Sequence, residues 1–364
     1  MSRVETGQGP FVRNAWYAAA SSEEVGQGLL ARTLLDEPLV LCRTGAGEPV
    51  ALQDRCAHRF APLSLGQRCG DEIACPYHGM RYGPDGVCTH VPGQGTVPPQ
   101  ARVRRYPTLE RYGLVFVWMG EVGLADAAAL VDIAQYGQPG WGLSRGHALF
   151  HACLDNILDN LIDPAHTTFV HQRTIGSDAG AQVAVQASLE DEHTIVCGRW
   201  VNHAPAVPMV QRFARPGGLV DRWQFYRVRP PCTSWVDFGS LPAGSPHTPQ
   251  AMDAAPYRVL SYAFLTPQDA SHTHYFSFQL RNFAADDAAV TTEFNALYKA
   301  TFDEDRVLLE AIQREEERAP GTPPVRIASD AGVARLRRLT QALREAEQPP
   351  ASDQASTVRA ISPS

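Results

Sequence analysis

The chain has 364 residues, of which 44% are hydrophobic and 20% charged, with a formal net charge of −7. This length is sufficient for two domains that each bury a core, and the mildly acidic balance gives no electrostatic reason to expect a nucleic acid or an anionic membrane as partner. The eight cysteines do not form a secreted disulfide framework, and we see no signal peptide or membrane-spanning run. We therefore predict a cytoplasmic protein.

The first third of the chain consists of short β-prone runs separated by Gly and Pro, which is typical of all-β folds. The clearest predicted strands are 38–42, 49–53 and 111–118. We expect an all-β first domain that spans residues 1–120.

The remainder mixes strands with helices. A strand-like run at 146–153 is followed by a helix at 154–163, in which apolar residues recur at helical spacing. Further strands are predicted at 194–201 and 274–280, and further helices at 289–318 and near 330–346, so the second domain spans residues 121–346. The polar, Pro-containing segment 347–364 is predicted to be disordered.

Cys56 and His58 are followed, after sixteen residues, by Cys75 and His78. All four side chains bind metals when deprotonated. Zinc fingers usually group Cys with Cys and His with His, whereas here each half supplies one of each. This pattern favours a Rieske 2Fe–2S cluster, in which two Cys hold one iron and two His hold the other. The alternative is a mixed Cys/His zinc ribbon.

A second candidate site contains Asp163, His166 and His171. On a continuous helix Asp163 and His166 would share a face, and a helix broken near Pro164 could return His171 to the side of His166. Two His and one carboxylate are the ligands of non-haem Fe(II) oxygenases. The alternative is a local cap with two ordinary histidines. Together, the two sites would supply electrons and bind dioxygen.

Three stretches carry a family resemblance: Phe11-Val-Arg-Asn-Ala-Trp-Tyr17, Cys56-Ala-His-Arg-Phe-Ala-Pro-Leu-Ser64 and Asp159-Asn-Leu-Ile-Asp163. From Phe11 to about residue 346 the chain resembles Rieske non-haem iron oxygenases, specifically oxygenase subunits of the vanillate and dicamba O-demethylase kind. The resemblance implies an α+β fold. An N-terminal Rieske domain would precede a helix-grip-like catalytic domain with an antiparallel sheet and flanking helices.

The resemblance also implies site residues that spacing alone does not select. The third iron ligand falls on Asp305, with Asp303 and Glu304 as alternatives if the alignment slips. Asn160 matches a residue near the iron. Asp237 matches a pocket-lining position, where it would accept a hydrogen bond from the substrate. The alternative for Asp237 is an exposed strand residue.

In this family an Asp that matches Asp163 lies between the iron site of one subunit and the cluster of the next, in a head-to-tail homotrimer. One oxygen of its carboxylate would orient His166 behind the iron, as carboxylates do beside metal-bound His. The other oxygen would meet His78 of the neighbouring subunit.

The implied function is that of a terminal oxygenase, a mono- or dioxygenase. Electrons from NAD(P)H would arrive through a separate reductase that contains a flavin and a plant-type iron–sulfur cluster. Dioxygen would then hydroxylate a small aromatic substrate, such as an aromatic acid, or remove an O-methyl group as formaldehyde. The alternatives are ring dihydroxylation, a pure electron carrier and a zinc-stabilised interaction protein.

Overall fold

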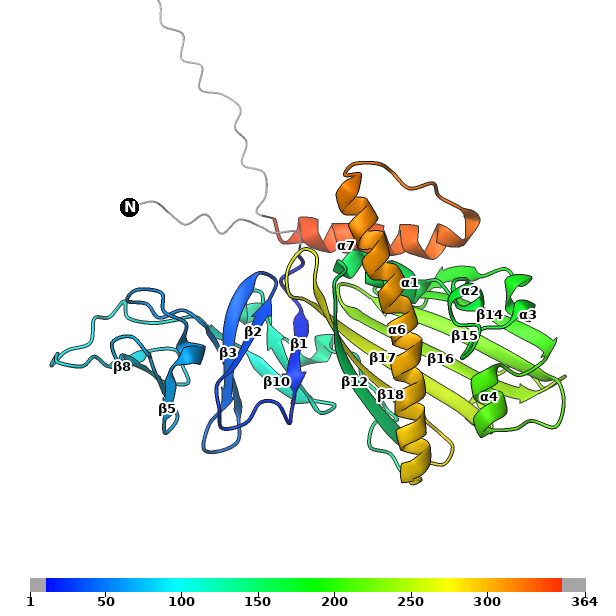
Figure 1. The fold of residues 1–364 in the computed structure, drawn as a ribbon, viewed down its shortest axis with the longest axis horizontal. Helices are drawn as coiled ribbons and strands as arrows, with labels where there is room; N and C mark the ends of the chain where they lie inside the picture. The colour runs from blue at the N-terminus through cyan, green and yellow to red at the C-terminus, as the bar shows by residue number, and fades with distance from the viewer. Residues whose placement is uncertain (1–10, 349–364) are drawn as a thin grey trace, which may run out of the picture.

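The computed structural model describes residues 11–348. Three small antiparallel sheets form the N-terminal part, and one large antiparallel sheet with helices forms the rest (Figure 1). The small sheets contain, in spatial order, β1 (Trp16–Ser21), β11 (Leu114–Trp118) and β10 (Thr108–Arg111); β2 (Leu30–Leu34), β3 (Glu37–Arg43), β4 (Pro49–Gln53) and β9 (Arg105–Tyr106); and β5 (Gln67–Cys69), β6 (Glu72–Ala74), β7 (Arg81–Tyr82) and β8 (Cys88–His90).

The strand predicted at 111–118 is wrong at its start. Tyr112 and Gly113 both have positive φ, 58° and 72°, and they connect β10 to β11 as a two-residue turn. A turn with two positive φ angles matches the twist of the strands that flank it. Only Leu114–Trp118 therefore forms the buried strand.

The large sheet has seven antiparallel strands, and α6 lies across it in Figure 1. In spatial order they are β12 (Gly142–Phe150), β18 (Thr273–Arg281), β17 (Tyr257–Pro267), β16 (Thr233–Pro242), β15 (Val220–Arg229), β14 (Ile195–Ala204) and β13 (Gln186–Leu189). The helices are α1 (Leu154–Ile162), α2 (Thr167–Val170), α3 (Asp178–Ala181), α4 (Pro208–Phe213), α5 (Pro249–Asp253), α6 (Ala288–Arg318) and α7 (Ala331–Ala346). The expected α+β architecture is confirmed.

An aromatic cluster joins the two parts. Side chains of β1 and β11 pack against β17 and β18, and the rings of Phe116 and Phe264 meet edge to face with centroids 5.1 Å apart. Thr266 donates a hydrogen bond of 2.7 Å to the carbonyl of Ala18 across the same contact. Buried aromatic area of this kind holds the two parts in one arrangement.

Helix α1 buries the apolar face that its sequence predicts, but it ends at Ile162 rather than at Asp163. Asp163 has extended angles, φ −105° and ψ 99°. The reason is Pro164, because the residue before a proline is disfavoured in the helical region. Asp163 and His166 therefore do not share a helical face.

The predicted helix 289–318 corresponds to α6, and its buried stripe includes Phe294, Tyr298 and Asp305. The end of α7 gives a correction, because Glu347, assigned to the disordered segment, is half-buried and accepts hydrogen bonds from the backbone N–H groups of Arg13 and Asn14. Residues 349–364 of that segment lie outside the described residues. Within 11–348, no helix combines the length and apolar character needed to cross a membrane.

Candidate metal centres

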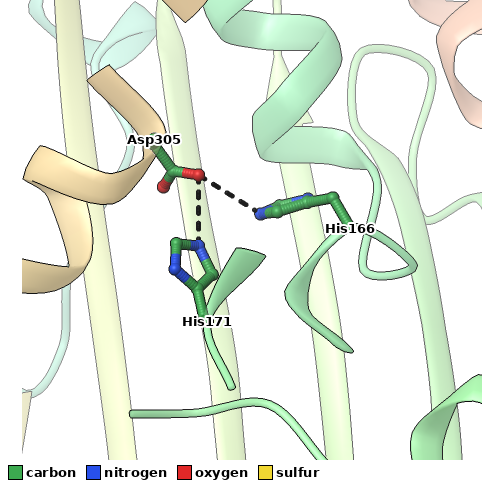
Figure 2. Close-up of side chains that lie close together, drawn as sticks. All are labelled: His166, His171 and Asp305. Atoms are coloured by element: carbon green, nitrogen blue, oxygen red, sulfur yellow. Dashed lines mark ion pairs between the residues drawn. The ribbon is translucent and has the colours of Figure 1, made fainter. Parts of the chain in front are cut away.

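The imidazoles of His166 and His171 and the carboxylate of Asp305 converge on one point (Figure 2). Their ligand atoms all lie within 4.8 Å of one another. Asp305 Oδ1 is 3.1 Å from His171 Nε2 and 3.6 Å from His166 Nε2. The break after α1 brings this about, because the single turn of α2 separates the two histidines and Asp305 faces them from α6.

The two imidazoles are held on their far sides, whereas Asp305 accepts a hydrogen bond at Oδ1, the oxygen that faces the histidines. His171 Nδ1 donates to Glu304 Oε2 at 2.8 Å, and Asn160 Nδ2 donates to Asp305 Oδ1 at 3.2 Å. His166 Nδ1 donates to the main-chain carbonyl of Asp163 at 2.5 Å. Contacts of this kind fix the imidazole tautomer and leave Nε2 of each ring facing the shared point.

The contact to His166 corrects the role predicted for the Asp163 carboxylate. Because α1 ends one residue early, the carbonyl of Asp163 is free of helical bonding and accepts from His166. The side-chain Oδ1 instead accepts from the N–H of Ala165 at 2.8 Å, as short acidic side chains do in turns.

Burial dominates the electrostatics of the three residues. It lowers the pKa of His166, so this imidazole is neutral at pH 7. Burial also acts to lower the pKa of His171, but the hydrogen bonds and charges of Asp305 and Glu304 outweigh it and raise that pKa. Among residues 11–348 no Lys or Arg pairs with buried Asp305. A buried carboxylate with two imidazoles is a donor set that fits Fe(II).

The two Cys–His loops have the same backbone hydrogen bonds. In each, the Cys N–H donates to the carbonyl five residues later, and the residue four after the Cys donates to the Cys carbonyl, at 2.8–3.0 Å. The fourth residue after the Cys has positive φ in both loops, 64° at Phe60 and 70° at Gly79. The loops are therefore structural equivalents, although one carries C-x-H and the other C-x-x-H.

Cys56 and Cys75 are buried, whereas His58 and His78 are exposed with ring centroids 4.7 Å apart. Tyr82 Oη lies 3.2 Å from Cys56 Sγ. All eight cysteines are free, so no disulfide links the loops. An inner pair of thiols and an outer pair of imidazoles fit a Rieske cluster, in which Cys holds one iron and His the other.

Comparisons with known proteins agree with this geometry. The Rieske [2Fe-2S] domain model matches residues 15–107, and the vanillate O-demethylase oxygenase C-terminal domain model matches residues 150–346. The chain is 36% identical to the iron–sulfur subunit of the toluene-4-sulfonate monooxygenase system of Comamonas testosteroni, over 93% of this chain and 98% of that protein. The chain belongs to the vanillate O-demethylase group of Rieske non-haem iron oxygenases.

Other relatives place it in the same group. It is 32% identical to the dicamba O-demethylase oxygenase component of Stenotrophomonas maltophilia, over 93% of this chain and 99% of that protein. Its fold matches the crystal structure of dicamba monooxygenase bound to dicamba with a TM-score of 0.84 and 30% identity, over 93% and 98% of the two chains. This Rieske oxygenase subunit therefore carries a 2Fe–2S cluster and Fe(II) as its cofactors. The domain boundary at residue 120 stays a prediction.

A cavity lies against the iron site of the oxygenase and is lined by His166, His171 and Asp305 themselves. Five aromatic side chains form much of its wall: Tyr226, Phe238, Tyr275, Tyr298 and Phe302. A wall of this composition suits a small aromatic molecule.

Asp237 does not line this cavity, so the predicted substrate contact is wrong, and the alternative of an exposed residue is wrong as well. Its neighbours Val236 and Phe238 face the cavity, and alternation along β16 directs Asp237 to the other face of the sheet. There it is buried, accepts a hydrogen bond from Trp223 Nε1 at 2.9 Å and pairs with Arg258 at 2.8 Å. Asp237 therefore belongs to a structural ion pair with Arg258.

Sequence reasoning treated Glu304 only as an alternative to Asp305, and it missed its contact with His171. Its position next to Asp305 was the available signal, since adjacent helical residues point about 100° apart and can reach different sides of one ring. Nothing in the sequence indicated the contact of Tyr82 with Cys56.

Proposed function

We propose that this oxygenase hydroxylates a C–H bond of a small aromatic acid or removes an O-methyl group from it. The aromatic-walled cavity in contact with the two histidines and the carboxylate is the observation that carries this proposal. The relatives named for toluene-4-sulfonate, dicamba and vanillate support an aromatic substrate. Electrons would come from NAD(P)H through a separate reductase with a flavin and a plant-type cluster.

We assign His166, His171 and Asp305 as the iron ligands, and Cys56, His58, Cys75 and His78 as the cluster ligands. When bound, the cluster relays single electrons and the iron activates dioxygen. The chain itself supplies orientation and exclusion of water. Glu304 and the Asp163 carbonyl hold the imidazoles, and the aromatic wall holds the substrate ring beside them.

The path of electrons supports a homotrimer. The cluster loops lie beside β5–β8 on one side of the molecule, and the iron site lies beside α2 on the opposite side (Figure 1). Asp163 is half-buried, and among the described residues its Oδ2 accepts no hydrogen bond. This oxygen suits the N–H of His78 from a neighbouring subunit in a head-to-tail ring.

The test is turnover with NAD(P)H, a surrogate flavin and iron–sulfur reductase, and a panel of aromatic acids that carry methyl or methoxy groups. We expect oxygen uptake coupled to a hydroxylated product, or to formaldehyde when a methoxy group is present. A cis-diol as the main product would show ring dihydroxylation instead. Absence of any product from protein with full iron and sulfide would overturn the proposal, as would zinc in place of both cofactors.

A further inference from the structure

Two buried arginines lie next to each other on the helix-covered face of the sheet, Arg199 on β14 and Arg222 on β15. Arg199 is fully engaged: its donors reach the carbonyls of Gly180, Val183 and Pro164 and the amide oxygen of Gln224, at 2.6–3.3 Å. Arg199 therefore anchors the segment 164–183, which contains the iron-site histidines, to the sheet.

Arg222 is 3% exposed and lines the cavity, yet it is poorly engaged. Among the described residues its hydrogen bond is from Nη2 to Ser177 Oγ, its buried Nε has no acceptor, and no carboxylate pairs with it. Burial lowers the pKa of Arg222 to about 10, so the guanidinium is still charged at neutral pH. A buried charge without a counter-charge is costly unless a ligand supplies one.

The position of Arg222 suits a substrate group far from the iron. Arg222, Gln224 and Tyr226 alternate onto the cavity face of β15. Tyr226 contacts Thr167, the residue after His166, and so marks the end of the cavity near the metal ligands. Arg222 lies four residues further along the strand, which is about 13 Å at the usual rise per residue. Arg222 and the metal ligands therefore lie at different ends of the cavity.

We propose that Arg222 binds the acidic group of the aromatic substrate, a carboxylate or a sulfonate, and so makes this oxygenase selective for aromatic anions. A planar guanidinium donates two parallel hydrogen bonds to such an oxyanion, which would engage the Nε that lacks an acceptor. The inference rests on the proposed function for the identity of the cavity, but it concerns binding alone.

The experiment measures binding to the holoprotein without reductase, by isothermal titration calorimetry. The probes are two matched pairs: 4-toluenesulfonate with 4-tolyl methyl sulfone, and 4-methoxybenzoate with 4-methoxyacetophenone. For Arg222→Gln we expect the affinity for the anions to fall about 30- to 100-fold, which corresponds to loss of a charge-assisted hydrogen-bond pair. The affinity for the neutral probes should stay within about twofold.

Arg227→Gln is the matched control, because Arg227 lies on the same strand but pairs with exposed Glu190 on the opposite face. Arg222→Lys keeps the charge without the planar donor pair, so it should lose about tenfold for the anions. If the Arg222→Gln variant does not fold, the anion affinities of Arg222→Lys test the proposal instead. The anionic probe that loses more affinity in the Arg222 variants, the sulfonate or the carboxylate, is the oxyanion that the site prefers.

Equal binding of anionic and neutral probes by the parent protein would overturn the proposal. Equal losses for all four probes in the Arg222 variants would also overturn it, since they would show a structural role. Selective binding of anions without any oxygenated product would leave this anchor in place and refute the proposed function. If Arg222→Gln turned over aromatic acids with unchanged affinity, the proposed function would stand and the role of Arg222 as an anchor would be refuted.

Discussion

The cluster loops and the iron site use histidine in opposite ways. His58 and His78 are exposed on loops within residues 56–79, which have the same internal hydrogen bonds. His166 and His171 are sheltered between α6 and the sheet and depend on a carboxylate from a distant part of the sequence. Exposed imidazoles suit electron transfer with a partner, whereas sheltered ones suit chemistry from which water must be excluded.

This difference predicts that the two sites can be lost separately. Asp305→Ala should abolish iron binding and product formation, because two histidines alone leave the donor set incomplete and α6 contributes no other ligand. The visible spectrum and acid-labile sulfide of the cluster should be unchanged. Iron and sulfide per chain check this, with Asp303→Ala as control, since Asp303 is more exposed and pairs with Lys299 on the same helix. Simultaneous loss of sulfide would contradict separate sites.

Asp163→Asn should uncouple the sites while leaving both filled. An amide oxygen can still accept from Ala165 N–H, and the main-chain bond to His166 does not depend on the side chain. We expect iron and sulfide at parent levels, with turnover reduced about 100-fold, the upper range for residues that support a metal site. Single-turnover reduction of the iron after photoreduction of the cluster would locate the defect. Normal turnover would refute the bridging role.

Glu304→Gln should affect the iron site alone and more mildly. In the parent protein the Glu304 charge orients His171 and raises the pKa of that imidazole. Without this charge, iron affinity should fall about 10- to 100-fold. Competition with an iron chelator measures this effect. Asp303→Asn, one residue earlier on α6, is the isosteric control and should not change the affinity. An iron affinity equal to that of the parent would show that Asp305 alone positions the ring.

Tyr82→Phe should give the smallest effect, and only at the cluster. The Tyr82 hydroxyl bonds Cys56 Sγ and also accepts from Ala57 N–H. A hydrogen bond to the sulfur stabilises the more negative, reduced cluster, so its loss should lower the reduction potential. The decrease should be at most roughly 60 mV, the one-electron equivalent of about 1.4 kcal/mol. Redox titration of the visible spectrum tests this, and a raised potential would contradict it.

Local features of the sequence predicted most of the elements and the cluster ligands. The spacing of Cys56, His58, Cys75 and His78 is a property of two short loops, and the apolar face of α1 follows from residues three and four apart. Where prediction failed locally, backbone geometry explains it. Pro164 ended α1 one residue early, and the pair Tyr112–Gly113 formed a turn inside a presumed strand.

The sequence by itself determined that two histidines near Pro164 were available as ligands, and family resemblance selected Asp305. Only the tertiary structure decided what surrounds them. Packing of α6 on the sheet directed Glu304 toward His171, and the pleat of β16 turned Asp237 away from the cavity. The sheet also buried Arg222 without a counter-charge. Packing decides which side chains of distant segments meet, and the spacing of residues along one segment does not predict these contacts.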